Sequence, residues 1–109
     1  MSRDHKPCDE SERKRIIESG GQIYQTATTI PSSSNNADDK KEIIIGPQRV
    51  LPGRLSVCRT FGDIEAKIAK RGGNPNVVIA EPEIKSFRIT DEHDFIVLAS
   101  DGIYDKLSN

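Results

Sequence analysis

Two carboxylates stand close together near the end of the chain, in the stretch DFIVLASDGIYDKLSN. Asp101 follows an apolar run from Phe95 to Ala99, and Asp105 comes four residues after Asp101. If a helix begins at the turn around Gly102, both carboxylates project to the same side, one helical turn apart. Two acids in such an arrangement repel each other unless a cation or a proton lies between them. Because Mg²⁺ and Mn²⁺ favour oxygen ligands, the spacing allows the hypothesis of a metal site.

The same residues also fit an ordinary turn. An Asp-Gly pair after a strand is commonly just a turn, and an Asp four residues later is often a helix cap. The stretch is unlike an EF-hand loop, because the Asp-x-Asp-x-Asp-Gly pattern is missing. Spacing alone therefore favours the structural interpretation, and other motifs have to decide between the two.

The elements that would position these acids are strands in the second half of the chain. The apolar run 95–99 predicts a nearly continuous strand that is buried on both faces. The stretch NVVIAEPEIKSFRIT predicts two more strands on either side of Glu81 and Pro82, and residues 91–93 predict a turn. We expect Ile84, Phe87 and Ile89 to face the core.

The first half of the chain predicts a short helix followed by further strands. Asp9 or Ser11 can cap a helix over 10–19, and the glycines at 20 and 21 would end it. Strands are expected from Ile23 onwards and again between 42 and 57. Gly46-Pro47 and Pro52-Gly53 signal turns, and residues 64–71 predict one or two helical turns.

A polar stretch, 26–41, separates the expected strands of the first half. It is rich in Ser, Thr, Asn and Asp, and it has too few apolar residues to offset the entropy lost on ordering. We interpret 26–41 as a flexible insertion loop within a hairpin. The whole sequence then predicts one α+β unit in which sheets pack together and helices lie outside.

Composition and charge exclude several classes of protein. Sixteen basic and seventeen acidic residues give a net charge of −1, and glutamates interleave the basic run Arg13–Arg15. With aromatic residues at only 5%, no nucleic-acid partner is expected. Two isolated cysteines indicate neither a disulfide framework nor a zinc site. No signal peptide or membrane-spanning run is present, so we expect a monomer in the cytoplasm or nucleus that does not bind membranes.

Five sequence blocks, taken in order, favour the metal-site hypothesis over the interpretation of an ordinary turn. They are RDHKP, ERKRIIESGG, RVLPGRLSVCRTFGD, PEI and DFIVLASDGIYDKLSN. Together they resemble the blocks of the PPM-type (type 2C) metal-dependent protein serine/threonine phosphatases, over nearly the whole chain except the polar stretch. Each block alone is weak evidence, but five in the same order with plausible spacing are strong evidence.

This resemblance implies a fold, a cofactor and a reaction. The fold is a β-sandwich of two antiparallel sheets flanked by helices, with Mg²⁺ or Mn²⁺ ions at one end. A water or hydroxide that bridges the ions attacks phosphoserine or phosphothreonine of a protein substrate directly. By resemblance, Asp101 ligates the catalytic metals, and Asp105 and Asp4 of RDHKP join it around an additional metal.

The departures from the family pattern imply a partial domain. The sequence lacks the upstream Asp-Gly-His-Gly block, an upstream acidic metal ligand, the acid histidine, the phosphate-binding arginine and the downstream Asp-Asn block. We therefore interpret 1–109 as an internal part of the domain that carries none of the family's catalytic groups and no assigned substrate-binding residue. Alone, it is expected to bind metal weakly and to show little or no phosphatase activity. The alternative is a pseudophosphatase or binding module that keeps the fold.

Other polar residues are expected to be structural. Neither Cys8 nor Cys58 begins the Cys-x5-Arg loop of a cysteine phosphatase, so both are expected to be inert. His5 should make structural hydrogen bonds, and His93 should be exposed in its turn. Arg59 and Asp63 are expected to be structural, in a buried ion pair or a cap.

Overall fold

The computed structural model describes residues 2–31 and 41–107. The chain divides into two units. The core unit is His5–Glu81, and the acid-bearing unit comprises Met1–Asp4 and Pro82–Asn109. None of the helices in the described part of the chain has the length and apolar character needed to cross a bilayer.

Helix α1 (Glu10–Glu18) confirms the helix predicted over 10–19. The Asp9 carboxylate caps it by accepting hydrogen bonds from the backbone N–H groups of Ser11 and Glu12. Gly20 follows with φ of +81°, a conformation that glycine adopts without a steric penalty. Ile16 is fully buried, whereas the adjacent Ile17 is 55% exposed, so one narrow face of the helix packs inward.

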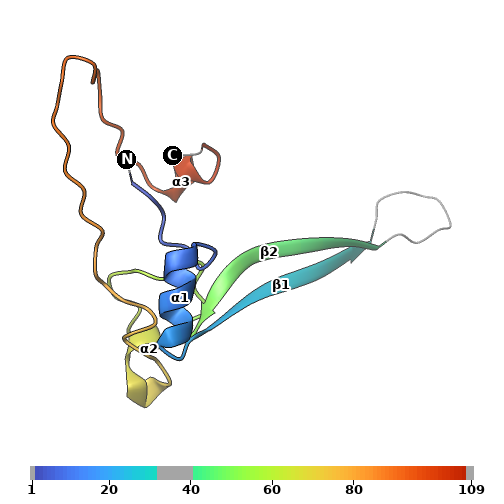
Figure 1. Cartoon of the computed structure of the whole chain (residues 1–109). Helices are drawn as coiled ribbons and strands as arrows, with labels where there is room; N and C mark the ends of the chain where they lie inside the picture. Colours follow the sequence, from blue (N-terminus) through green and yellow to red (C-terminus); the bar gives the residue numbers. More distant parts are fainter. Residues whose placement is uncertain (1, 32–40, 108–109) are drawn as a thin grey trace. The chain divides into compact units, whose positions relative to one another are not determined.

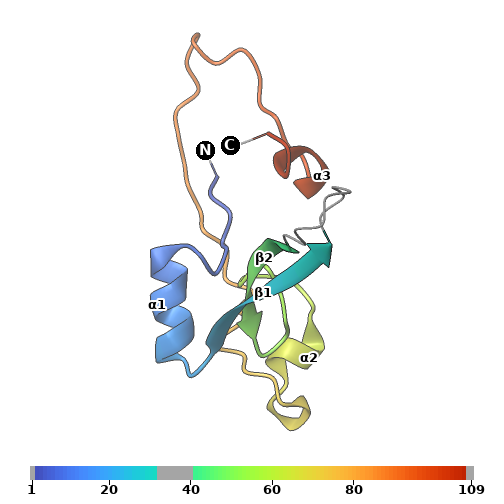
Figure 2. The same cartoon turned by 90° about the vertical axis from the view of Figure 1, so that its right-hand side faces the viewer.

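Strands β1 (Gln22–Pro31) and β2 (Lys41–Leu51) form an antiparallel ribbon that runs away from α1 and α2 (Figure 1, Figure 2). The predicted loop 26–41 is therefore too long at both ends, because strand pairing continues to Pro31 and Lys41. Backbone hydrogen bonds across the ribbon outweigh the polar composition there. The rest of the predicted loop lies outside the described residues.

Gly46-Pro47 is a bulge inside β2, so the prediction of a turn there was wrong. Gln25 pairs with Gln48 and Ala27 pairs with Ile45, which leaves one more residue on β2 than on β1 in this interval. A Cβ atom on Gly46 would lie 2.7 Å from the Thr26 hydroxyl oxygen, so any larger residue there would force the Thr26 side chain to move.

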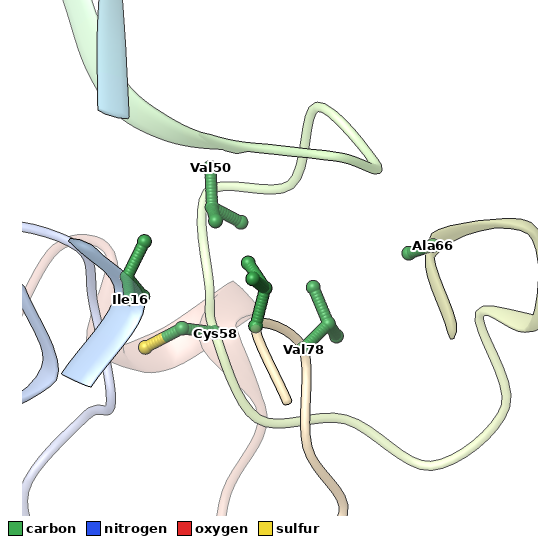
Figure 3. Packing of buried hydrophobic residues seen from close by; sticks show 6 residues of the cluster. Ile16, Val50, Cys58, Ala66 and Val78 are labelled. Carbon is green, nitrogen blue, oxygen red and sulfur yellow. The ribbon is translucent and has the colours of Figure 1, made fainter. Parts of the chain in front are cut away.

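The rest of the core unit is irregular chain with two short helical turns, α2 (Ile64–Lys67) and η1 (Ala69–Arg71), as the sequence predicted. The prediction of a strand around Leu55 and Val57 reduces to isolated bridges, Val50 with Leu55 and Arg59 with Ile79. Figure 3 shows the buried apolar side chains gathered around a common centre. They come from α1, β2, α2 and the irregular chain: Ile16, Val50, Cys58, Ala66, Val77 and Val78.

The strands predicted in the acid-bearing unit do not form. The described residues from 82 to 100 contain no strand, and Phe95 and Leu98 of the expected buried run are 80% and 93% exposed. Ile84, Phe87 and Ile89, which were expected to face the core, are exposed as well. A strand needs a neighbour to pair its backbone groups, and the described part of this unit supplies none. The predicted turn at 91–93 is present, closed by a hydrogen bond from His93 N to Thr90 O.

The coarse class predicted from the sequence is confirmed. The described chain combines short helices with two antiparallel strands, which is compatible with part of a larger α+β domain. The core that holds these elements together is small, and it lies wholly within the core unit.

Candidate functional site

Asp101 and Asp105 lie at the two ends of a single helical turn. Helix α3 (Asp101–Tyr104) begins at Asp101, and Asp105 follows as its C-terminal cap residue. The Asp105 N–H donates to the Asp101 carbonyl at 2.9 Å, the hydrogen bond expected between residues four apart in a helix. Both aspartates are exposed. The structure therefore confirms the predicted turn of helix and the one-turn spacing of the two acids.

The third predicted acid, Asp4, belongs to the same unit as Asp101 and Asp105. Carboxylate oxygens are the donors that Mg²⁺ and Mn²⁺ prefer, so the type of ligand fits the expected cofactor. In residues 2–31 and 41–107 no three His, Cys, Asp or Glu side chains are grouped so that they could hold an ion, so these residues alone do not complete a metal centre. The metal-ligand roles of Asp4, Asp101 and Asp105 therefore stay predictions.

A buried ionic cluster lies in the core unit, centred on Glu12 of α1. Glu12 is 1% exposed, and its Oε2 atom accepts a hydrogen bond from Arg15 at 2.8 Å. Its Oε1 atom accepts hydrogen bonds from Arg59 Nε at 3.1 Å and from Arg59 Nη2. The Cys58 Sγ atom lies 3.1 Å from Glu12 Oε2. The prediction of a buried ion pair for Arg59 is confirmed, with Glu12 as the partner.

The cluster shifts the pKa values of Glu12, Cys58 and Arg59. Burial opposes ionisation of Glu12, but hydrogen bonds from Arg59, Arg15 and Cys58 outweigh it and lower the Glu12 pKa to about 2. Burial, together with the hydrogen bond to Glu12, raises the pKa of the Cys58 thiol to about 12. The hydrogen bond to Glu12 also raises the pKa of Arg59. At neutral pH the carboxylate is ionised and the thiol is protonated, which supports the prediction that Cys58 is inert.

Sequence reasoning missed the burial of Glu12, one of the glutamates around the basic run Arg13–Arg15. A signal was present, because Glu12 precedes Ile16 by four residues and so shares the buried face of α1. Arg15, three residues after Glu12, was within reach on the same face. The partners from residues 58 and 59 could not be read from the helix alone.

The remaining sequence predictions have mixed outcomes. His93 is exposed as expected, and its ring contacts Phe87 and the Thr90 hydroxyl. Asp63 precedes α2 but makes no side-chain capping hydrogen bond, so the alternative of a cap was wrong for this residue. Tyr104 is half-buried, and its hydroxyl donates to the Val97 carbonyl at 3.4 Å.

Comparison with known proteins places these features in a family. The family model described as protein phosphatase 2C matches residues 1–109. Probable protein phosphatase 2C 25 of Arabidopsis thaliana is 37% identical over the whole chain, which covers 21% of that relative. Probable protein phosphatase 2C 27 of Oryza sativa subsp. japonica is 36% identical over the whole chain, which covers 25% of that relative.

The chain matches the relatives in sequence, and it matches only part of each relative. The chain spans between a fifth and a quarter of the length of these two proteins. No solved structure matches it. Because the family model covers the chain from end to end, the chain belongs to the protein phosphatase 2C family.

Proposed function

We propose that this chain is part of a metal-dependent protein phosphatase that hydrolyses phosphoserine and phosphothreonine in protein substrates. The observation that carries the proposal is the match of the protein phosphatase 2C model to residues 1–109. The chain spans about a fifth of the length of its relatives. The activity is therefore proposed for a longer protein like those relatives. The chain by itself is proposed to have little or no activity.

In this proposal Asp101, Asp105 and Asp4 supply carboxylate oxygens for Mg²⁺ or Mn²⁺. The one-turn spacing of Asp101 and Asp105 on α3 and the exposure of all three acids support that role. The described residues do not complete a metal centre, so further ligands have to come from other parts of a phosphatase domain. We propose a monomer in the cytoplasm or nucleus, with phosphoproteins as partners and without binding to nucleic acid or membranes.

The proposal extends to the fold of the acid-bearing unit. Its exposed apolar run, Phe95 to Leu98, has the composition of a buried strand but has no partner strand in the described chain. In a complete two-sheet sandwich, neighbouring strands would cover this run and hold Asp101 at its end. Burying Phe95 and Leu98 would stabilise that arrangement by about 25 cal/mol for each Å² of apolar surface removed from water.

A chimera tests the proposed function. The matching segment of probable protein phosphatase 2C 25 is replaced by residues 1–109, and dephosphorylation of a phosphothreonine peptide is measured with Mn²⁺. We expect the chimera to be active and the isolated chain to be nearly inactive. A chimera that is folded by circular dichroism but inactive, beside an active parent, would favour the pseudophosphatase alternative. Robust turnover by the isolated chain would contradict the proposal that the chain needs further parts of the domain.

A further inference from the structure

The chain enters and leaves the core unit at two residues, His5 and Glu81. The His5 carbonyl accepts a hydrogen bond from the Cys58 backbone N–H at 2.9 Å, and the Cys58 Sγ atom lies 2.8 Å from the same oxygen. The Glu81 carbonyl accepts a hydrogen bond from Arg59 Nη1 at 3.1 Å. Two consecutive residues, Cys58 and Arg59, therefore bind both connections.

One buried carboxylate binds both of these residues. Glu12 Oε2 lies 3.1 Å from Cys58 Sγ, and Glu12 Oε1 accepts two hydrogen bonds from Arg59. Glu12 and Cys58 are buried, so water does not readily replace Glu12 as the partner of either residue. Removing the carboxylate would loosen Cys58 and Arg59, the two residues that hold the connections, at the same time.

The backbone joins the same parts of the chain. Thr60 N donates to the Ile79 carbonyl at 2.9 Å, and Ile79 N donates to the Cys58 carbonyl at 3.2 Å. The residues from 58 to 60 thus lie between the chain at His5 and the chain leading to Glu81, with hydrogen bonds to each. Because the residues from 58 to 60 are partners of both connections, this arrangement favours opening of the two connections in one step.

We propose that Glu12, Cys58 and Arg59 form a latch that makes the connections at His5 and Glu81 open together. The latch is a conformational device, separate from the phosphatase reaction. The consequence of the latch for the acids rests on the proposed function. Asp4 adjoins His5, and the segment that carries Asp101 begins after Glu81. In that case both segments that carry the acids are joined in sequence to connections that the latch holds.

Native-state hydrogen exchange of the whole chain, followed by NMR at low urea concentrations, tests the latch. The Cys58 amide reports the connection at His5, and the Thr60 and Ile79 amides report the connection near Glu81. We expect these amides to show the same opening free energy and the same dependence on urea, as one cooperative unit does. Two different opening free energies, one for Cys58 and another for Thr60 and Ile79, would overturn the proposal.

The variant Glu12→Gln sharpens the test, with Glu18→Gln as its matched control. Glu18 is an exposed residue of the same helix, 3.9 Å from Lys14. In Glu12→Gln we expect exchange at the Cys58 and Ile79 amides to rise together by at least about tenfold, and no change in Glu18→Gln. Faster exchange at only one of the two amides, or at neither, would overturn the latch.

Alkylation by iodoacetamide gives a second readout in the same variants. Cys58 is a buried member of the latch, whereas Cys8 is exposed and serves as an internal reference. The ratio of Cys58 to Cys8 labelling should rise in Glu12→Gln by at least about tenfold and stay constant in Glu18→Gln. If Glu12→Gln unfolds the whole chain, the urea series on the unmodified protein still decides. No arm requires phosphatase activity, so a failure of the latch and a failure of the proposed function can be told apart.

Discussion

The core unit and the acid-bearing unit contain similar apolar residues but bury them to very different extents. Ile16, Val50 and Val77 of the core unit are fully buried. Every described residue from 82 to 107 is exposed except the half-buried Tyr104. The difference does not come from composition, because the run Phe95 to Leu98 is as apolar as any stretch of the core unit. It comes from which partners the chain itself provides.

The core unit supplies its own pairing and packing partners, some of them adjacent in the sequence and others distant. Helix α1 leads directly into β1, and β1 pairs with β2, the next strand in the sequence. Closing such local contacts costs little chain entropy. The acid-bearing unit has no such neighbour in the described chain, so its apolar run stays exposed. The residues proposed to do chemistry are therefore those whose placement depends most on the rest of a phosphatase domain.

Hydrogen exchange across the chain should show the largest contrast between the units. We expect the β1 and β2 amides that pair across the ribbon near Val50 to exchange roughly a thousandfold more slowly than amides in 82–100, a difference of about 4 kcal/mol. The reason is that the described amides in 82–100 have few backbone partners. Mass spectrometry of the labelled chain checks this. Slow exchange of the amides in 95–99 would contradict the contrast between the two units.

Two adjacent isoleucines in α1 sharpen the comparison inside the core unit. Ile16→Ala should lower the free energy of unfolding by about 2–5 kcal/mol, because it leaves a cavity in a fully buried cluster. Ile17→Ala, at a position that is 55% exposed, should change it by less than about 0.5 kcal/mol. Urea denaturation followed by circular dichroism measures both. Equal effects would show that the core is not where the structure places it.

The pH dependence of stability should depend on Glu12. Because its pKa falls from 4.5 to about 2 on folding, ionised Glu12 stabilises the fold above pH 4.5, and this contribution disappears as the pH falls to about 2. The contribution is about 3 kcal/mol. The difference in unfolding free energy between the unmodified chain and Glu12→Gln should therefore shrink over this range, since a protonated Glu resembles Gln. A difference that stays constant down to pH 2 would contradict the buried ion pair.

The smallest effect is expected for Asp4 and Asp105, the two acids that are proposed to act through an additional ion. In the active chimera, Asp4→Asn and Asp105→Asn should each lower Mn²⁺-dependent activity by roughly tenfold, since each is proposed to act through an additional ion. The exposed Asp91, within the turn that follows Thr90, gives a control variant Asp91→Asn with no effect. Losses as large as those from removing a ligand of the catalytic ions would contradict this assignment.

Local signals in the sequence predicted the helical parts well. The cap at Asp9, the glycines after α1 and the helical turns in 64–71 were each encoded within a few residues. The turn of helix that joins Asp101 to Asp105 was a condition of the metal-site hypothesis, and the structure contains it. These elements depend on caps, glycines and periodicity, which can be read without knowing the rest of the fold.

Features that depend on distant partners were not predictable in this way. The strand expected at 76–80 reduces to a bridge between Ile79 and Arg59, and the strands expected between 83 and 99 need neighbours that the described chain does not contain. Gly46-Pro47 carries a turn signal, but cross-strand pairing turned it into a bulge. The burial of Glu12 requires Arg59 and Cys58, which lie more than forty residues away in the sequence. The candidate acids were identified by resemblance, and their common site stays a prediction.

Asp101→Asn in the phosphatase 2C chimera tests the central claim most directly. The assay is Mn²⁺-dependent dephosphorylation of a phosphothreonine peptide, with Asp94→Asn as an exposed control and circular dichroism to confirm folding. We predict that Asp101→Asn lowers activity by more than about a hundredfold while Asp94→Asn leaves it unchanged. Unchanged turnover in a folded Asp101→Asn chimera would contradict the role of Asp101 and, with it, the proposed metal-dependent reaction.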